Sequence, residues 1–315
     1  AVAGVCVLAV LDPAKAPLVL AGAVLFTNLV AATQDIATDG LAVRTLEHHE
    51  RGWGNGIQVG GYRVGMILGG GALLVVYDKV GWTVAMLGLA VLLALSSVPL
   101  WRSETGKERV ATSGGFSFDW LFRSGAMPWV AVLFAFKFGD YLAGAMLRPW
   151  LVDLELSKTE IGTMMGGGGF VAGLVGALIG GALVARLGRV PSLVAFGAAQ
   201  AAGSVAYALA WLAPSLPVLW GAVMLEHLLG GLATAALFTA MMDASRPEKA
   251  ATDYTLQASL VVLAGGLGAA LSGFVAQHIG YVGCFALGAA LAALAPLFAA
   301  TPWLTRIIRP QPTKG

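Results

Sequence analysis

Charge is scarce in this sequence: Asp, Glu, Lys and Arg make up 11% of its 315 residues, whereas a soluble domain carries roughly 25%. The formal net charge is only +2, which provides no basic surface for a nucleic acid. The two cysteines, Cys6 and Cys284, lie in apolar runs without zinc or disulfide spacing. HExxH, GxSxG and histidines with metal spacing are missing. We therefore expect neither an enzyme nor a metal or other cofactor.

Apolar residues dominate instead, at 58% of the chain with a mean hydropathy of +0.80. They form blocks of about 20 residues, the length that crosses a bilayer as a helix. The short alternating segments of transmembrane strands are not seen. We predict an all-α, multi-pass membrane protein with a partial helix at 1–11 and nine full spans. The full spans are expected near 17–40, 55–77, 81–101, 126–150, 161–185, 190–212, 216–242, 255–277 and 281–304.

Basic residues set the predicted orientation of these spans. Thirteen Lys and Arg residues fall in one set of alternating connections and four in the other. Positively charged loops stay on the cytoplasmic side. The first set, which includes the connection 102–125 and the tail 306–315, is therefore expected to be cytoplasmic.

The polar stretch 102–125 reads as a linker between two helix bundles. Before it lies a partial N-terminal bundle (1–101), and after it a six-helix C-terminal bundle (126–305). A weak repeat supports this division, because TQDIATDGLAVRTLEHHERGWGNG and FTAMMDASRPEKAATDYT each place an Asp at a helix exit before a glycine-rich span. Parallel repeats of this kind are typical of the major facilitator architecture. We expect two helices and part of a third to be missing from the N-terminus.

Charged residues inside spans are the strongest functional indicators in such a chain. Asp35 and Asp39 share one helix face, and Arg63 lies roughly two turns into the next span. We predict an Asp35–Arg63 pair, either a static bridge that fixes helix register or a gate that opens during transport, whereas Asp39 reaches water. Gln34 and Tyr62 are expected to hydrogen-bond a polar solute.

A second cluster is predicted in the C-terminal bundle. Lys137 and Asp140 are three residues apart near the middle of one span, and Glu226 lies at the same depth in another. A lysine between two carboxylates would leave one carboxylate able to take up and release a proton. The alternative is again a static bridge. His227 is expected only to face a neighbouring helix.

Glycine is abundant, with 43 residues. Two sets spaced four apart are predicted to pack helices closely: Gly61, Gly65 and Gly69, and Gly176 and Gly180. The run MMGGGGF at 164–170 indicates either a hinge or loose packing.

The stretch GGALVARLGRVPS at 180–192 resembles the loop signature of the major facilitator superfamily, G-x-x-x-D-R-x-G-R. Four residues match it: Gly181, Arg186, Gly188 and Arg189. Ala185 replaces the acidic residue of the signature, which weakens its charge lock.

The whole chain resembles the AmpG family of muropeptide permeases within that superfamily. The resemblance rests on AATQDIATDGLAVRTLEHHERGWGNGIQVGGYRVGM (31–66), FAFKFGDYLAGAML (134–147), GALIGGALVARLGR (176–189) and EHLLGGLATAALFTAMMD (226–243). It implies a twelve-helix transporter of the bacterial inner membrane that imports 1,6-anhydromuropeptides (GlcNAc-anhydroMurNAc, with or without a peptide) together with protons. We expect it to be a monomer.

By motif match, eight residues fall where the family keeps polar groups, and they are the predicted substrate and proton pathway: Gln34, Asp35, Asp39, Tyr62, Arg63, Lys137, Asp140 and Glu226. The acetyl-CoA transporters are a similar family and remain the alternative. A multiply anionic cargo should require several cavity-facing cations, and only Arg63 and Lys137 are clearly within spans.

Overall fold

The computed structural model describes residues 1–12, 15–102, 118–123, 125–302, 304 and 308. Within these ranges every regular element is a helix, which confirms the predicted all-α class. Most of the predicted linker 102–125, and the predicted tail 306–315 apart from Ile308, lie outside the described residues.

The N-terminal helix group contains α1 (Val2–Val10), α2 (Pro17–Thr45), α3 (Arg51–Met66), the π-helical η1 (Ile67–Ala72) and α4 (Leu73–Arg102). Pro17 opens α2, where a missing backbone N–H has no cost because the first helical turn leaves it unpaired anyway. Gly81 breaks α4 with a φ of +80°, a left-handed value that glycine adopts without a steric penalty.

The C-terminal helix group follows, and its elements are η2 (Asp119–Phe122), α5 (Ala126–Ala145), α6 (Leu147–Asp153), α7 (Lys158–Ile161), η3 (Gly162–Gly169), α8 (Phe170–Leu187), α9 (Arg189–Leu212), α10 (Leu216–Ala244), η4 (Pro247–Lys249), α11 (Ala250–Ala292) and α12 (Leu294–Ala299). The glycine run predicted as a hinge lies in η3, a wider π-helical turn of a kind often found at functional sites.

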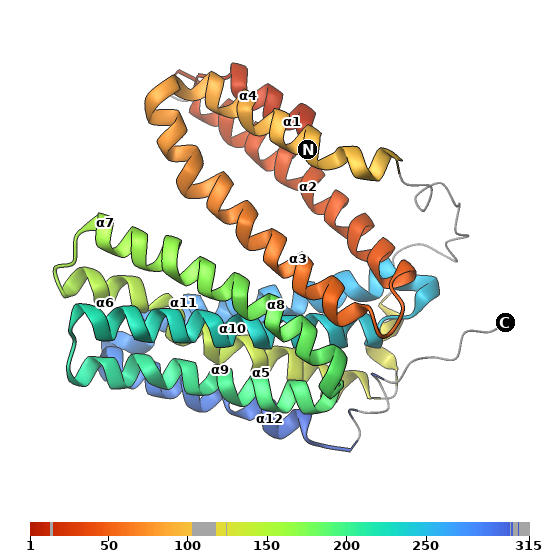
Figure 1. Cartoon of the computed structure of the whole chain (residues 1–315), viewed down its shortest axis with the longest axis vertical. Coiled ribbons are helices and arrows are strands. Elements are labelled where there is room, and N and C mark those ends of the chain that lie inside the picture. Colours follow the sequence, from red (N-terminus) through yellow and green to blue (C-terminus); the bar gives the residue numbers. More distant parts are fainter. Residues whose placement is uncertain (13–14, 103–117, 124, 303, 305–307, 309–315) are drawn as a thin grey trace.

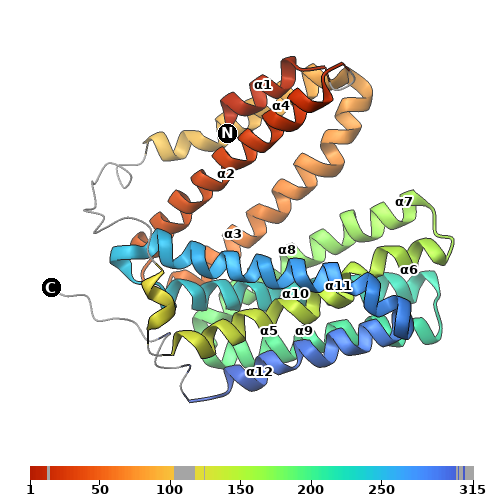
Figure 2. The ribbon, with the colours of Figure 1, turned by 180° about the vertical axis from the view of Figure 1, so that it is seen from behind.

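Seven helical runs are long and apolar enough to cross a membrane, so this criterion does not confirm the nine predicted full spans. One run, Pro247–Ala299, covers two predicted spans, because the helix breaks at Gly280 and the chain then turns back (Figure 2). The predicted span 55–77 is not among the seven. Its helix α3 carries Asn55, Gln58 and Arg63, which lower its hydropathy.

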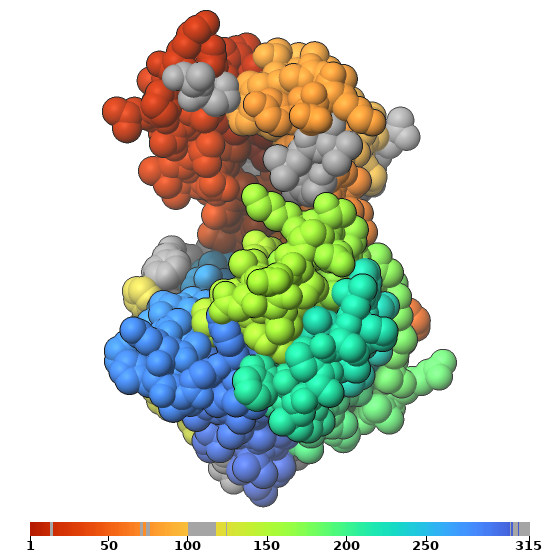
Figure 3. Space-filling model, turned by 90° about the vertical axis from the view of Figure 1, so that its left-hand side faces the viewer, coloured from red at the N-terminus to blue at the C-terminus, as the bar shows by residue number. Residues whose placement is uncertain are grey.

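The two helix groups lie together at one end and diverge toward the other (Figure 1). At the contact end, Gly40 of α2 lies against Ala251 of α11, and Gly52 of α3 against Gly181 of α8. The open end carries the starts of α2 and α7. Viewed toward that end, the surface is hollowed between the two groups (Figure 3).

Close glycine contacts explain how α3 lies so near α8. Gly52, Gly56 and Gly60 face α8, and an added Cβ on Gly56 would lie 3.0 Å from the carbonyl oxygen of Ala177. The prediction that Gly61, Gly65 and Gly69 pack against a neighbouring helix was therefore wrong. A Cβ added to any of the three would have no neighbouring atom within 4 Å, because the opposite glycine face of the helix makes the contact. The prediction for Gly176 and Gly180 is confirmed, since they contact Leu228 and Leu232 of α10.

Candidate functional site

A buried polar cluster lies inside the C-terminal group, on α5, α9 and α10. Lys137 and Asp140 are adjacent on one face of α5, with 6% and 9% of their surface exposed. The Lys137 Nζ lies 3.3 Å from Asp140 Oδ2 and donates a 3.0 Å hydrogen bond to Thr234 Oγ1 of α10. Among the described residues, Asp140 Oδ1 is buried without a hydrogen-bond partner. The pair is therefore anchored through one carboxylate oxygen, and the side chain of Gln200 on α9 lies near the carboxylate.

Glu226 of α10 forms a second hydrogen-bonded group beside this pair. Its Oε2 accepts a 2.7 Å hydrogen bond from the hydroxyl of Tyr207 on α9 and lies 2.8 Å from Nδ1 of His227. The predicted network of three charges thus consists of two groups, because Lys137 binds Asp140 and acts on Glu226 only as a nearby charge. Two donors hold Glu226 as a carboxylate.

The sequence alone did not indicate the roles of Tyr207 and His227. His227 contacts more than a neighbouring helix: besides its bond to Glu226, its ring lies against Gly169 of η3, where an added Cβ would be 2.9 Å from Nε2. No motif marks Tyr207. Its role is visible only in the structure, where the rotation of α9 about its axis turns Tyr207 toward Glu226.

Arg63 reaches this cluster from the other helix group. Its guanidinium lies so close to Gly173 of α8 that a Cβ on that glycine would overlap it. The carboxylates that act on its charge are Glu226 and Asp140. The predicted Asp35–Arg63 pair does not form, because the glycine face of α3 turns Arg63 toward α8 and leaves Asp35 exposed on α2.

The remaining predicted residues of α2 and α3 lie apart from the cluster. Asp39 is half-buried and accepts a 2.6 Å hydrogen bond from Gln58, a residue that the sequence did not single out. Gln34 is exposed, and Tyr62 is 69% exposed. The structure therefore brings together Arg63, Lys137, Asp140 and Glu226, and leaves the other four predicted pathway residues outside this cluster.

The loop motif at the contact end forms a charge lock with an acid from another helix. Arg189 donates to the fully buried carboxylate of Asp243 on α10 at 2.5 Å, and Arg51 at the start of α3 donates to the same carboxylate at 2.7 Å. Arg189 also donates to the carbonyl oxygen of His48, in the connection between α2 and α3. Asp243 therefore supplies the negative charge that the loop signature would place at position 185, where this chain has Ala185. Its bonds to Arg189 and Arg51 also join the two helix groups.

The other motif residues have simpler placements. Gly181 contacts Gly52 across the two groups, and Gly188 ends α8 with a φ of +85°. Arg186 is exposed. The sequence signal that could have identified Asp243 is its position at a helix exit beside a basic loop, which the FTAMMDAS repeat already contained.

A second cluster of ion pairs stabilises the connection between α10 and α11. Arg246 donates to Asp253 at 2.7 Å and to Asp119 at 3.0 Å, and these hydrogen bonds hold the pKa of its guanidinium above the usual value. Trp120 is fully buried and donates to the carbonyl oxygen of Ala244 at 3.2 Å. The segment that precedes α5 is thus docked at the contact end.

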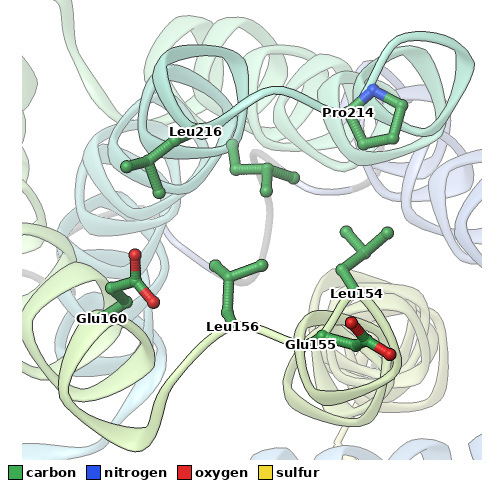
Figure 4. Close-up of a pocket in the computed structure, with 7 residues that line it drawn as sticks. Leu154, Glu155, Leu156, Glu160, Pro214 and Leu216 are labelled. Carbon is green, nitrogen blue, oxygen red and sulfur yellow. The ribbon is translucent and has the colours of Figure 1, made fainter.

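A cavity of about 290 Å³ lies at the opposite end of the C-terminal group (Figure 4). Leucines line much of it, and its two carboxylates are Glu155 and Glu160. Glu160 is already engaged, because it accepts hydrogen bonds from the backbone N–H and hydroxyl of Ser157 in a capping box. Lys137, Asp140 and Glu226 do not line this cavity, so it is not the candidate site.

Comparison with known proteins places these features in a family. The profile of the Major Facilitator Superfamily matches residues 129–315. The anhydromuropeptide permease of Escherichia coli (strain K12) is 30% identical over 240 residues, which cover 73% of this chain and 49% of that protein. The putative transporter AmpG 4 of Rickettsia felis is 25% identical over 275 residues, which cover 82% of this chain and 66% of that protein. The chain therefore spans about half the length of the Escherichia coli permease it matches.

A solved structure shares the fold at lower sequence identity. The outward-facing crystal structure of a bacterial homologue of the iron transporter ferroportin aligns with a TM-score of 0.63 at 20% identity. The alignment covers 91% of this chain and 72% of that one.

Proposed function

Because the chain belongs to the major facilitator superfamily and is an AmpG-like permease, we propose that the whole protein imports 1,6-anhydromuropeptides across the bacterial inner membrane together with protons. The observation that carries this proposal is the buried charge cluster. Ionisable side chains within membrane spans are costly and mark solute and proton pathways. Lys137, Asp140 and Glu226 lie in such spans, and Arg63 approaches them from the other helix group.

The two carboxylates suit different roles in this proposal. Glu226 accepts from Tyr207 and pairs with His227, so its anionic form is held in place. Asp140 uses one oxygen for Lys137, and the other is buried without a partner among the described residues. Asp140 is therefore our candidate for the group that takes up and releases the transported proton, with Lys137 as its counter-ion.

The arrangement of the helix groups supports alternating access. If the basic connections are cytoplasmic, the contact end closed by Asp243, Arg189 and Arg51 faces the cytoplasm. The open end then faces the periplasm, where the solute is released from the cell wall. Breaking the Asp243 lock while closing the open end would carry the solute across.

The test is uptake by the full-length protein in proteoliposomes. Labelled GlcNAc-anhydroMurNAc is supplied with and without an inward proton gradient, and labelled acetyl-CoA is supplied in parallel. We expect gradient-stimulated uptake of the sugar and none of acetyl-CoA. Folded protein that takes up acetyl-CoA but not the sugar would contradict the proposed substrate and favour the alternative cargo.

A further inference from the structure

We propose that Arg63 binds a carboxylate of the transported solute at the interface between the two helix groups. This inference rests on the proposed transport function and adds the group of the solute that is recognised. Three observations support it: the surroundings of Arg63, the partners that already bind the neighbouring carboxylates, and the net charge of the cluster.

Unlike Arg51, Arg189 and Lys137, Arg63 has no bound anion among the described residues. Arg51 and Arg189 donate to Asp243, and Lys137 pairs with Asp140. Within the part of the chain that the structure describes, no carboxylate lies within 4 Å of the Arg63 guanidinium, and no hydrogen bond engages it. An unpaired guanidinium in a membrane-spanning region is costly, so the position favours an anionic ligand.

The location of Arg63 makes it accessible to a solute between the groups. One turn before it, Gly60 still contacts Leu174 of α8, whereas Gly61 and Gly65 face open space. Arg63 therefore lies where α3 leaves α8, at the boundary between the contact end and the open end. Gly173 provides the room for its guanidinium to lie directly on α8.

The nearby carboxylates are already engaged. Asp140 is paired with Lys137, and Glu226 is held by Tyr207 and His227. A guanidinium presents parallel N–H donors that match the two oxygens of a carboxylate. A carboxylate brought by the solute would thus complete the coordination of Arg63 without displacing either internal group.

Charge balance links this binding to the proton. Besides His227, which pairs with Glu226, the cluster holds two cations, Arg63 and Lys137, and two carboxylates, Asp140 and Glu226. A solute carboxylate adds one negative charge to a buried region, where unbalanced charge is costly. One proton, taken up by Asp140 or by His227, restores the balance. A single free cation suits one carboxylate better than the several phosphate charges of acetyl-CoA.

The experiment compares a sugar acid with its neutral amide. Full-length protein in proteoliposomes, under an inward proton gradient, is given labelled GlcNAc-anhydroMurNAc or the primary amide of its lactyl carboxylate. We expect wild type to prefer the acid by about tenfold or more, as for a charge-assisted hydrogen bond. In Arg63→Gln this preference falls to near one while uptake of the amide persists, and Arg63→Lys gives an intermediate preference. Arg148→Gln, at an exposed arginine, keeps the wild-type preference.

Protection of Arg63 from phenylglyoxal, read by mass spectrometry, provides a measurement that does not depend on a variant. The acid should protect Arg63 and the amide should not. An Arg63→Gln protein that still prefers the acid, or equal protection by the two compounds, would overturn the inference while leaving the transport function intact. Wild-type protein that takes up neither compound would instead contradict the proposed substrate, and this site with it.

Discussion

Replacing Asp140 with asparagine is expected to lower gradient-driven uptake by at least about 10²-fold while the protein remains folded. Asparagine keeps the size of the side chain and an oxygen acceptor for Lys137, but it cannot exchange a proton. Because Asp140 Oδ1 is buried without a partner among the described residues, this is the oxygen that we expect to be protonated. The measurement is sugar uptake with a proton gradient, alongside sugar exchange without one, which should persist because it needs no net proton movement.

Two further variants make the result interpretable. Asp78→Asn alters an exposed aspartate by the same chemistry and should leave uptake unchanged. Glu226→Gln should weaken uptake because it removes the negative charge that Tyr207 and His227 stabilise. Unchanged gradient-driven uptake in both Asp140→Asn and Glu226→Gln would rule out the cluster as the proton pathway.

Replacing Asp243 with asparagine should weaken the contact end. Its carboxylate is fully buried and shared by Arg51 and Arg189, so the change leaves two guanidinium groups without their anion. Removing one partner of a buried ion pair costs about 3–5 kcal/mol. We expect a melting temperature lower by on the order of 5–10 °C, measured by intrinsic fluorescence in detergent.

The matched control for this prediction is Glu248→Gln, an exposed carboxylate at the same end of the molecule. It should melt as wild type does. An Asp243→Asn protein with the melting temperature of wild type would mean that the lock contributes nothing to the observed conformation.

The sequence was sufficient for features that depend on composition and on spacing within one helix. Apolar blocks of about 20 residues identified the all-α membrane fold, though not the number of spans, and the three-residue spacing of Lys137 and Asp140 placed both on one face of α5. These inferences hold because helix geometry is the same in any context.

Contacts between helices were harder to predict, because they depend on how each helix is rotated about its axis. Arg63 and Asp35 lie at compatible depths, yet the packing of Gly52 and Gly56 on α8 turns Arg63 away from α2. The same limitation hid Asp243, whose partners come from α9 and from the start of α3. Depth can be counted along a sequence, whereas rotation is set by packing.

Alternating access requires the two helix groups to rock about the buried cluster. The most direct test is the distance between spin labels at Leu18, which is 86% exposed at the start of α2, and Lys158, which is exposed at the start of α7. The labels are placed in full-length protein whose native cysteines have been replaced, and double electron–electron resonance is recorded. The account predicts that adding GlcNAc-anhydroMurNAc at acidic pH shifts the distribution to shorter distances as the open end closes. An unchanged distribution in protein that transports the sugar would contradict it.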